Sequence, residues 1–284
     1  MNRHSTPFIK VGFAFFVWSL LGPILNISSF TVEQSIWSIS FLALLYLFLY
    51  SYFNKEIDQL KNLKFDSSLL LFIVSSGFSG VLWLYSLTLI PIAQAVLLYS
   101  VVPLLTFILG LFFLNEQPQV TKIVALLLGI IGVGMILISN LGKLSFDDRF
   151  FFGFLSVLTA ACLTAVQAII TKKLTFDHST WISVFLIMLS QTLIITPFAF
   201  AHQWQITPFA VASTLFLSIF SSIIAFFFYV DGFRFLRSST VTLIGYIEPM
   251  LAAIWGYFFL HQFLTITVAL GGILILIAGY LALH

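Results

Sequence analysis

Long apolar runs dominate the chain, and short polar or Gly/Pro-containing stretches separate them. A helix that crosses the hydrocarbon core of a bilayer needs about 20 mostly apolar residues. The pattern therefore predicts an all-α polytopic membrane protein with ten membrane-spanning helices. Their approximate cores are residues 8–27, 32–53, 69–90, 92–114, 119–139, 151–174, 180–201, 208–232, 239–260 and 264–283.

The second half of the chain repeats the first at an offset of 146 positions, which is the spacing between Pro103 and Pro249. At this offset, residues 103–114 and 249–260 are identical at seven of twelve positions. Such a register indicates an internal duplication.

Each half then holds five helices. Because five is an odd number, the second copy must be inverted in the membrane relative to the first. Inverted repeats are common in secondary transporters, where the substrate site lies near the midplane between the repeats. The predicted repeats are residues 1–140 and 151–284, joined by an external linker at 141–150.

Basic residues gather on one side of the predicted bundle, which favours a cytoplasmic location for that side. Only Lys143 and Arg149 fall on the other side. Both termini are therefore predicted to be cytoplasmic, in the inner membrane of a bacterial-type cell. The ten residues on the basic side are Arg3, Lys10, Lys55, Lys61, Lys64, Lys122, Lys172, Lys173, Arg234 and Arg237.

Composition supports a lipid bilayer as the main surrounding of the chain. Hydrophobic residues make up 61% of it, charged residues 8%, and the mean hydropathy is +1.12, whereas soluble domains carry roughly a quarter charged residues. The net charge of +2 is small and the Lys and Arg residues are scattered along the chain, which argues against nucleic-acid binding. A single cysteine, Cys162, excludes an intrachain disulfide and a multi-cysteine metal site.

The sequence does not favour an enzyme, a metal site or a bound cofactor. It has no Walker loop, no dinucleotide fingerprint and no His-Glu-x-x-His motif. The histidines all fall in predicted loops or at termini: His4, His178, His202, His261 and His284.

Glu248 is the sharpest candidate for a functional side chain, because it lies within the apolar run from Ser239 to Leu260. A carboxylate inside a bilayer is costly and usually serves a partner, a cavity or a substrate path. Glu248 could bind a cationic group or exchange a proton; alternatively, it is a structural acid that hydrogen-bonds nearby backbone or hydroxyl groups. Asp231 lies three residues before Arg234, and the two side chains are interpreted as a local ion pair on one face of the helix.

Four aromatic residues complete the candidate substrate site. Trp and Tyr are usually enriched at membrane interfaces, so rings near the centre of a span are candidates for lining a cavity, although packing is the favoured interpretation for each ring taken separately. With one carboxylate, such rings suit an organic cation through cation–π attraction, and alone they suit apolar amino acids. These residues are Trp18, Trp83, Tyr99 and Tyr246.

Pro103 and Pro249 occupy equivalent positions in the two halves. A proline removes a backbone donor and weakens a helix, so the two are predicted to act as hinges. The alternative is a static kink that neighbouring helices stabilise.

With these features, the chain resembles the EamA-type carriers of the drug/metabolite transporter superfamily. The resemblance rests on two copies of a pattern in which a proline-containing helix ends near an acidic residue and a Gly-rich helix follows. Gln262 replaces the usual acid in the second copy, and Trp18 is similar to a Trp that many relatives carry. The copies read Val101-Val-Pro103 through Leu114-Asn-Glu116 to Gly129-Ile-Ile-Gly132, and Ile247-Glu-Pro249 through Leu260-His-Gln262 to Ala278-Gly279.

The resemblance implies a secondary carrier that moves a small organic metabolite by alternating access, as a monomer or a homodimer, with proton coupling as one option. The sequence favours efflux of amino acids or related metabolites, because central rings outnumber the central acid. Uptake of an organic cation such as a quaternary amine is the alternative, with Glu248 as counter-charge. A non-transporting membrane scaffold is the third option.

Overall fold

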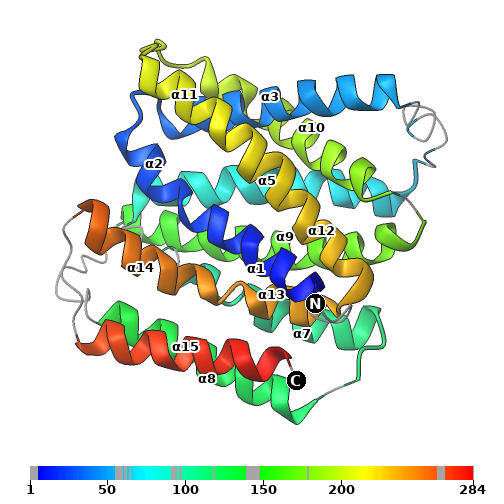
Figure 1. Ribbon diagram of the computed structural model, residues 1–284, viewed down its shortest axis with the longest axis vertical. Coiled ribbons are helices and arrows are strands. Elements are labelled where there is room, and N and C mark those ends of the chain that lie inside the picture. The colour runs from blue at the N-terminus through cyan, green and yellow to red at the C-terminus, as the bar shows by residue number, and fades with distance from the viewer. Residues whose placement is uncertain are drawn as a thin grey trace.

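The computed structural model describes residues 6–54, 60, 63, 65–90, 95, 98–117, 119–138, 148–177, 179–260 and 266–283. Every regular element within these residues is a helix (Figure 1). The first half contains α1 (Thr6–Ser19), α2 (Leu21–Ile27), α3 (Val32–Phe53), α5 (Ser67–Leu89), α7 (Val102–Phe113) and α8 (Val120–Ile138). The second half contains α9 (Asp148–Asp177), α10 (Thr180–Ala199), α11 (Pro208–Leu217), the π-helix η2 (Ser218–Ala225), α12 (Phe226–Phe235), α13 (Ser238–Ile244), α14 (Ile247–Leu260) and α15 (Ile266–Leu283).

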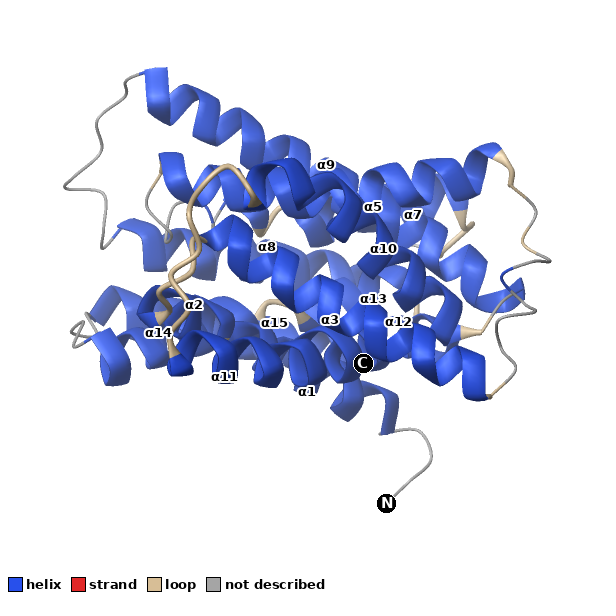
Figure 2. Ribbon diagram, turned by 90° about the horizontal axis from the view of Figure 1, so that it is seen from above, coloured by secondary structure: helices blue, strands red, loops and turns tan. Residues whose placement is uncertain are grey.

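These helices fall on the ten predicted runs, and the all-α fold is confirmed. Five stretches are each long and apolar enough to cross a membrane, and shorter apolar helices occupy most of the remaining runs. Figure 2 shows that the helices run between the same two ends of the molecule, where the loops gather. The five long stretches are Thr6–Leu25, Val32–Phe53, Phe151–Thr175, Thr180–Ala199 and Pro208–Phe235.

Several predicted spans are interrupted helices. The first run divides at Leu20 into α1 and α2, and the ninth divides at Gly245 and Tyr246 into α13 and α14. The fourth run was predicted from residue 92, but α7 begins at Val102. Residues 91–94 and 96–97 lie outside the described part of the chain, as do residues 139–147, which include most of the predicted linker.

The prolines explain where two of these helices begin. Pro103 stands in the first turn of α7, and Pro249 is the third residue of α14. In the first turn a missing N–H costs no helical hydrogen bond, and the fixed φ of proline suits the start of a helix. Both prolines therefore mark helix starts rather than kinks within a continuous helix.

The helices α8 (Val120–Ile138) and α15 (Ile266–Leu283) occupy positions about one repeat offset apart in the sequence. The most extensive packing joins helices of opposite halves: α5 with α9, α8 with α15, and α3 with α10. Figure 1 shows α8 and α15 side by side along one edge, and the ends marked N and C toward the same side. The two halves thus form one interlocked helical bundle.

Two kinds of apolar surface account for the many phenylalanines. The largest buried cluster contains residues of both halves, including Phe72 of α5 and Phe233 of α12, neither of which is exposed. Other rings point outward, such as Phe112 and Phe113 at the end of α7. In a bilayer the hydrocarbon tails surround such outward rings. The core-facing and lipid-facing sides of the helices are therefore both apolar.

Candidate functional site: an aromatic and acidic group between the two halves

Glu248 lies in the first turn of α14, just after the break that separates α13 from α14. Its backbone N–H donates to the carbonyl oxygen of Gly245 at 3.0 Å, which closes the turn between the two helices. The side chain is partly buried. The break thus brings the carboxylate to the start of a helix, whereas the sequence predicted a place within one continuous span.

Tyr99 contacts two helices, α5 of the first half and α9 of the second. Its ring packs against Trp83 of α5, with 4.4 Å between the ring centroids, and its hydroxyl hydrogen-bonds Oγ1 of Thr164 in α9 at 2.7 Å. The Glu248 carboxylate lies within electrostatic range of Tyr99. A tyrosine with one apolar face and one hydroxyl can satisfy both kinds of neighbour.

Trp18 of α1 sits on the α11–α12 side of the bundle. Its Nε1 donates to the carbonyl oxygen of Ser221 at 3.1 Å, and its ring contacts Tyr229 and Phe226 edge-on, with centroid separations of 5.2 and 4.9 Å. Ser221 belongs to the π-helix η2. π-Helical turns disturb the regular backbone pattern and occur often at functional sites, and here such a turn presents a carbonyl to the indole.

The internal repeat relates some residues of this site to one another. At the offset of 146, Trp18 corresponds to Thr164 and Trp83 to Tyr229. The Tyr99–Thr164 hydrogen bond and the Trp18–Tyr229 ring contact each join the first half to the second, whereas the Trp83–Tyr99 contact lies within the first half. We refer to Trp18, Trp83, Tyr99, Thr164, Tyr229 and Glu248 as the aromatic–acid group.

The carboxylate of this group comes from the second half and has no acidic counterpart at the repeat offset. The residue that corresponds to Glu248 in the first half is Val102, a buried side chain in α7. The residue that corresponds to Tyr99 is Gly245, where an added Cβ would lie 2.8 Å from the ring of Phe15. The two sides of the site therefore differ in shape and in charge, although the repeat relates their backbones.

Tyr246 does not join this group. Its side chain is buried in a second hydrophobic cluster with Phe107, Leu126 and Ile275, on the side of α8 and α15. Within the described part of the chain its hydroxyl has no hydrogen-bond partner. The structure therefore places Tyr246 as a packing residue between helices.

Asp231 bonds to a partner in the other half. Its Oδ2 accepts from Nζ of Lys10 in α1 at 3.0 Å, which ties α1 to α12. The sequence analysis had interpreted Arg234 as the partner, because the spacing along one helix says nothing of a cation on a neighbouring helix.

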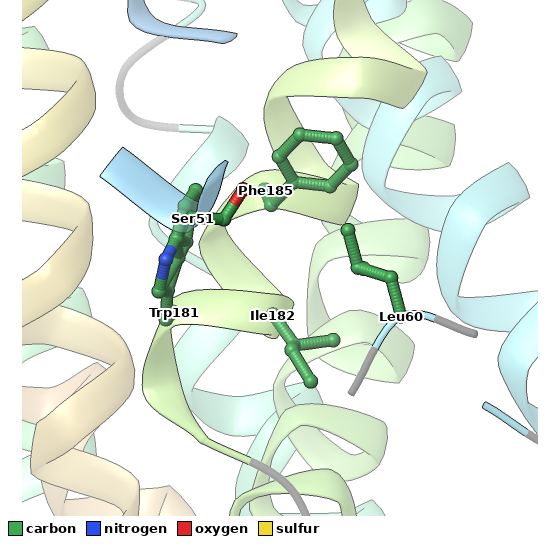
Figure 3. Close-up of a pocket in the computed structure, with 5 residues that line it drawn as sticks. All are labelled: Ser51, Leu60, Trp181, Ile182 and Phe185. Carbon is green, nitrogen blue, oxygen red and sulfur yellow. The ribbon is translucent and has the colours of Figure 1, made fainter. Parts of the chain in front are cut away.

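A small pocket at the end of α3 and the start of α10 holds none of the candidate residues (Figure 3). Its lining is mostly apolar; the hydroxyl of Ser51 donates to the carbonyl oxygen of Phe48 at 2.9 Å, and Trp181 adds an indole N–H. Among the described residues, no three His, Cys, Asp or Glu side chains are grouped to hold a metal ion. The aromatic–acid group is therefore the candidate functional site.

Sequence reasoning missed two members of this group, Thr164 and Tyr229. Neither stands out in composition, because hydroxyl and aromatic residues are frequent in this chain. The repeat offset is the signal that would have found them, since it maps Trp18 and Trp83 onto these positions.

The comparisons with known proteins agree with this architecture. S-Adenosylmethionine uptake transporters of Rickettsia felis and Rickettsia prowazekii are each 28% identical over 188 residues, which cover 66% of this chain and 61% of theirs. The uncharacterized transporter YoaV of Bacillus subtilis is 28% identical over 206 residues, 70% of this chain and 68% of its own. The chain thus matches about three fifths of the length of the Rickettsia relatives.

A solved crystal structure shares the fold, with a TM-score of 0.79, 16% sequence identity, and coverage of 98% of this chain and 96% of that one. Residues 8–138 and 151–283 each match one sequence family, so the family covers both halves of the chain. The chain belongs to the EamA-like transporter family.

Proposed function

We propose that the protein is a secondary carrier that moves a small organic cation across the membrane by alternating access between its two halves. The aromatic–acid group carries this proposal, because it combines one carboxylate with rings from both halves. The proposal includes two repeats at 1–140 and 151–284, cytoplasmic termini in the inner membrane, and hinges at the helix starts marked by Pro103 and Pro249.

The physical argument begins with the desolvation of the cation. A cation that leaves water needs a counter-charge and polarisable faces, which Glu248 and the rings of Trp83 and Tyr99 supply. The Rickettsia relatives are named for S-adenosylmethionine, which carries a sulfonium centre and a stackable adenine ring. S-Adenosylmethionine is therefore the first compound to test, ahead of choline-like amines.

Efflux of amino acids or related zwitterionic metabolites is the second candidate. The observation that favours it is the hydrogen-bonded pair of Tyr99 and Thr164, whose hydroxyls can bind a zwitterion without using a counter-charge. In that case Glu248 would serve proton coupling or local structure instead of substrate binding.

The test is a thermal-shift screen of the detergent-purified protein, followed by flux of radiolabelled compound into proteoliposomes. A ligand that binds only the folded state raises its apparent stability. We expect S-adenosylmethionine or a quaternary amine to stabilise the native protein and Glu248→Gln to abolish the shift. Glu33→Gln, which changes an acid in the first turn of α3, is the matched control.

Two other outcomes would replace the proposal. If zwitterionic amino acids stabilise the native protein and Glu248→Gln equally, the efflux function is favoured and the counter-charge role of Glu248 is wrong. If no metabolite shifts the native protein and no compound is transported, the scaffold alternative is favoured.

A further inference from the structure

Glu116 joins the two halves at the basic end of the bundle, which we define by Lys122 and Arg237. It follows α7 in the first half, yet its carboxylate accepts three hydrogen bonds from the start of α13 in the second half. Oε1 accepts from the backbone N–H of Ser238 at 2.7 Å and from its hydroxyl at 2.6 Å, and Oε2 accepts from the hydroxyl of Ser239 at 2.8 Å.

The turn after α7 is shaped to present this carboxylate. Asn115 has a φ of 52°, a left-handed conformation that asparagine tolerates better than most residues. The backbone N–H of Glu116 then donates back to the carbonyl oxygen of Gly110 at 3.1 Å. A Cβ at Gly110 would lie only 3.1 Å from Oε2 of Glu116, so the glycine leaves room for the contact.

Two neighbouring hydrogen bonds span the same boundary. Lys122, at the start of α8, is buried and donates from Nζ to Oγ1 of Thr240 in α13 at 2.6 Å. Arg237 donates to the carbonyl oxygen of Gln117 at 3.2 Å. The turn between α7 and α8 therefore holds α13 through side chains on both sides.

α13 connects this contact with the candidate site. All seven of its residues are buried, and it ends at the break that precedes Glu248. A short buried helix moves as a unit. Displacement of its first residue, Ser238, would therefore also displace the start of α14.

The bonds to Glu116 are suited to repeated opening. A carboxylate that accepts from hydroxyl and amide groups gains strong charge-assisted hydrogen bonds, but water can replace these donors when the interface opens. At the repeat offset the sequence has Gln262 in place of Glu116, and Ile92 and Ala93 in place of Ser238 and Ser239. The second copy of the sequence pattern therefore lacks both the acid and the two serines.

We propose that Glu116 with Ser238 and Ser239 is the closing contact of a gate at the basic end, and that it breaks each time the carrier opens toward that end. The gate rests on the alternating access of the proposed function. It goes beyond that function because it names the contact whose opening exposes the path to the site.

The test measures access to a thiol behind the gate, and needs no substrate. Cys162→Ser first removes the native thiol, and Thr242→Cys then places a reporter in α13, one turn inward from Ser238. The full chain is reconstituted in liposomes, and a membrane-impermeant maleimide is applied from the basic end. We expect Glu116→Gln to raise the labelling rate roughly tenfold, because the neutral amide removes the charge that strengthens all three hydrogen bonds.

A second variant and a second reporter keep the outcome decisive. Ser239→Ala removes only one of the three bonds, and we expect a smaller increase in labelling than with Glu116→Gln. Ala278→Cys, buried in α15, reports on general loosening and should stay unlabelled. Unchanged labelling at position 242 in both variants, or an equal rise at positions 242 and 278, would overturn the gate.

The design also separates this proposal from the proposed function. If Glu116→Gln opens position 242 but no substrate is found, the gate stands and the substrate class is wrong. If substrate binds at Glu248 and the labelling does not change, the carrier stands and the gate lies elsewhere.

Discussion

Gly129 and Tyr246 provide a quantitative test of how closely α8 approaches the break between α13 and α14. A Cβ at position 129 would lie 2.2 Å from Cε2 of Tyr246, so the ring would have to retreat by roughly 1.2 Å to reach an ordinary 3.4 Å contact. Tyr246 is only 1% exposed, and overpacking of a filled core costs about 1–3 kcal/mol. Gly129→Ala should therefore destabilise the fold by that amount relative to a matched glycine.

Gly134 is that match, because it lies in the same helix and an added Cβ would meet no atom within 4 Å. Both substitutions gain the same helix propensity, about 1 kcal/mol at most, so their difference isolates the contact with Tyr246. Thermal unfolding in detergent and unfolding in mixed SDS micelles would measure it. Equal stability of Gly129→Ala and Gly134→Ala would refute the packing.

A double-mutant cycle adds a second check. Tyr246→Ala alone leaves a cavity and should destabilise the protein by about 3–5 kcal/mol, as for other large-to-small core changes. Combined with Gly129→Ala, the loss should be smaller than the sum of the two, because the new methyl group then faces space. Simple additivity would show that the two positions do not touch.

Three further predictions concern individual hydrogen bonds and the orientation of the chain. Thr164→Val and Tyr99→Phe should each raise the KM of transport severalfold. The double variant should raise it no further, because each change removes the same 2.7 Å hydrogen bond. Independent effects of the two changes would argue against this bond. Lys10→Met should lower the free energy of unfolding by roughly 1–3 kcal/mol, because Asp231 is only 15% exposed and would lose its cation. Adding Asp231→Asn to the same chain should restore much of the lost stability in a thermal-unfolding assay. A cysteine at Gln117, in an otherwise cysteine-free chain, should react with impermeant maleimide only from the cytoplasmic side; reaction only from outside would reverse the predicted orientation.

Helix positions could be predicted from the sequence, because the bilayer sets the length of apolar runs. The interruptions could not. Gly245 and Tyr246 lie within a continuous apolar run, yet α13 ends at Ile244 and α14 begins at Ile247. Hydropathy carries no information on such tertiary contacts.

Side-chain direction was the second limit. In a bilayer the lipid-facing and core-facing sides of a helix are both apolar, so periodicity does not distinguish them. Trp83 and Tyr246 looked alike in the sequence, but the structure puts Trp83 against Tyr99 and buries Tyr246 beside Ile275. The repeat offset would have been the stronger guide, since it relates Trp83 to Tyr229.

The interlocking of the two halves has a consequence for biosynthesis. When the ribosome has completed the chain as far as α8, the main partners of α3, α5 and α8 have not yet been made, because these partners are α10, α9 and α15. Until the second half is synthesised, the early helices remain in lipid or beside the insertion machinery with their polar side chains unpacked. A chain that stalls or is truncated between the halves is therefore an expected target for membrane proteases, whereas the two halves expressed together as separate polypeptides have all the surfaces needed to assemble.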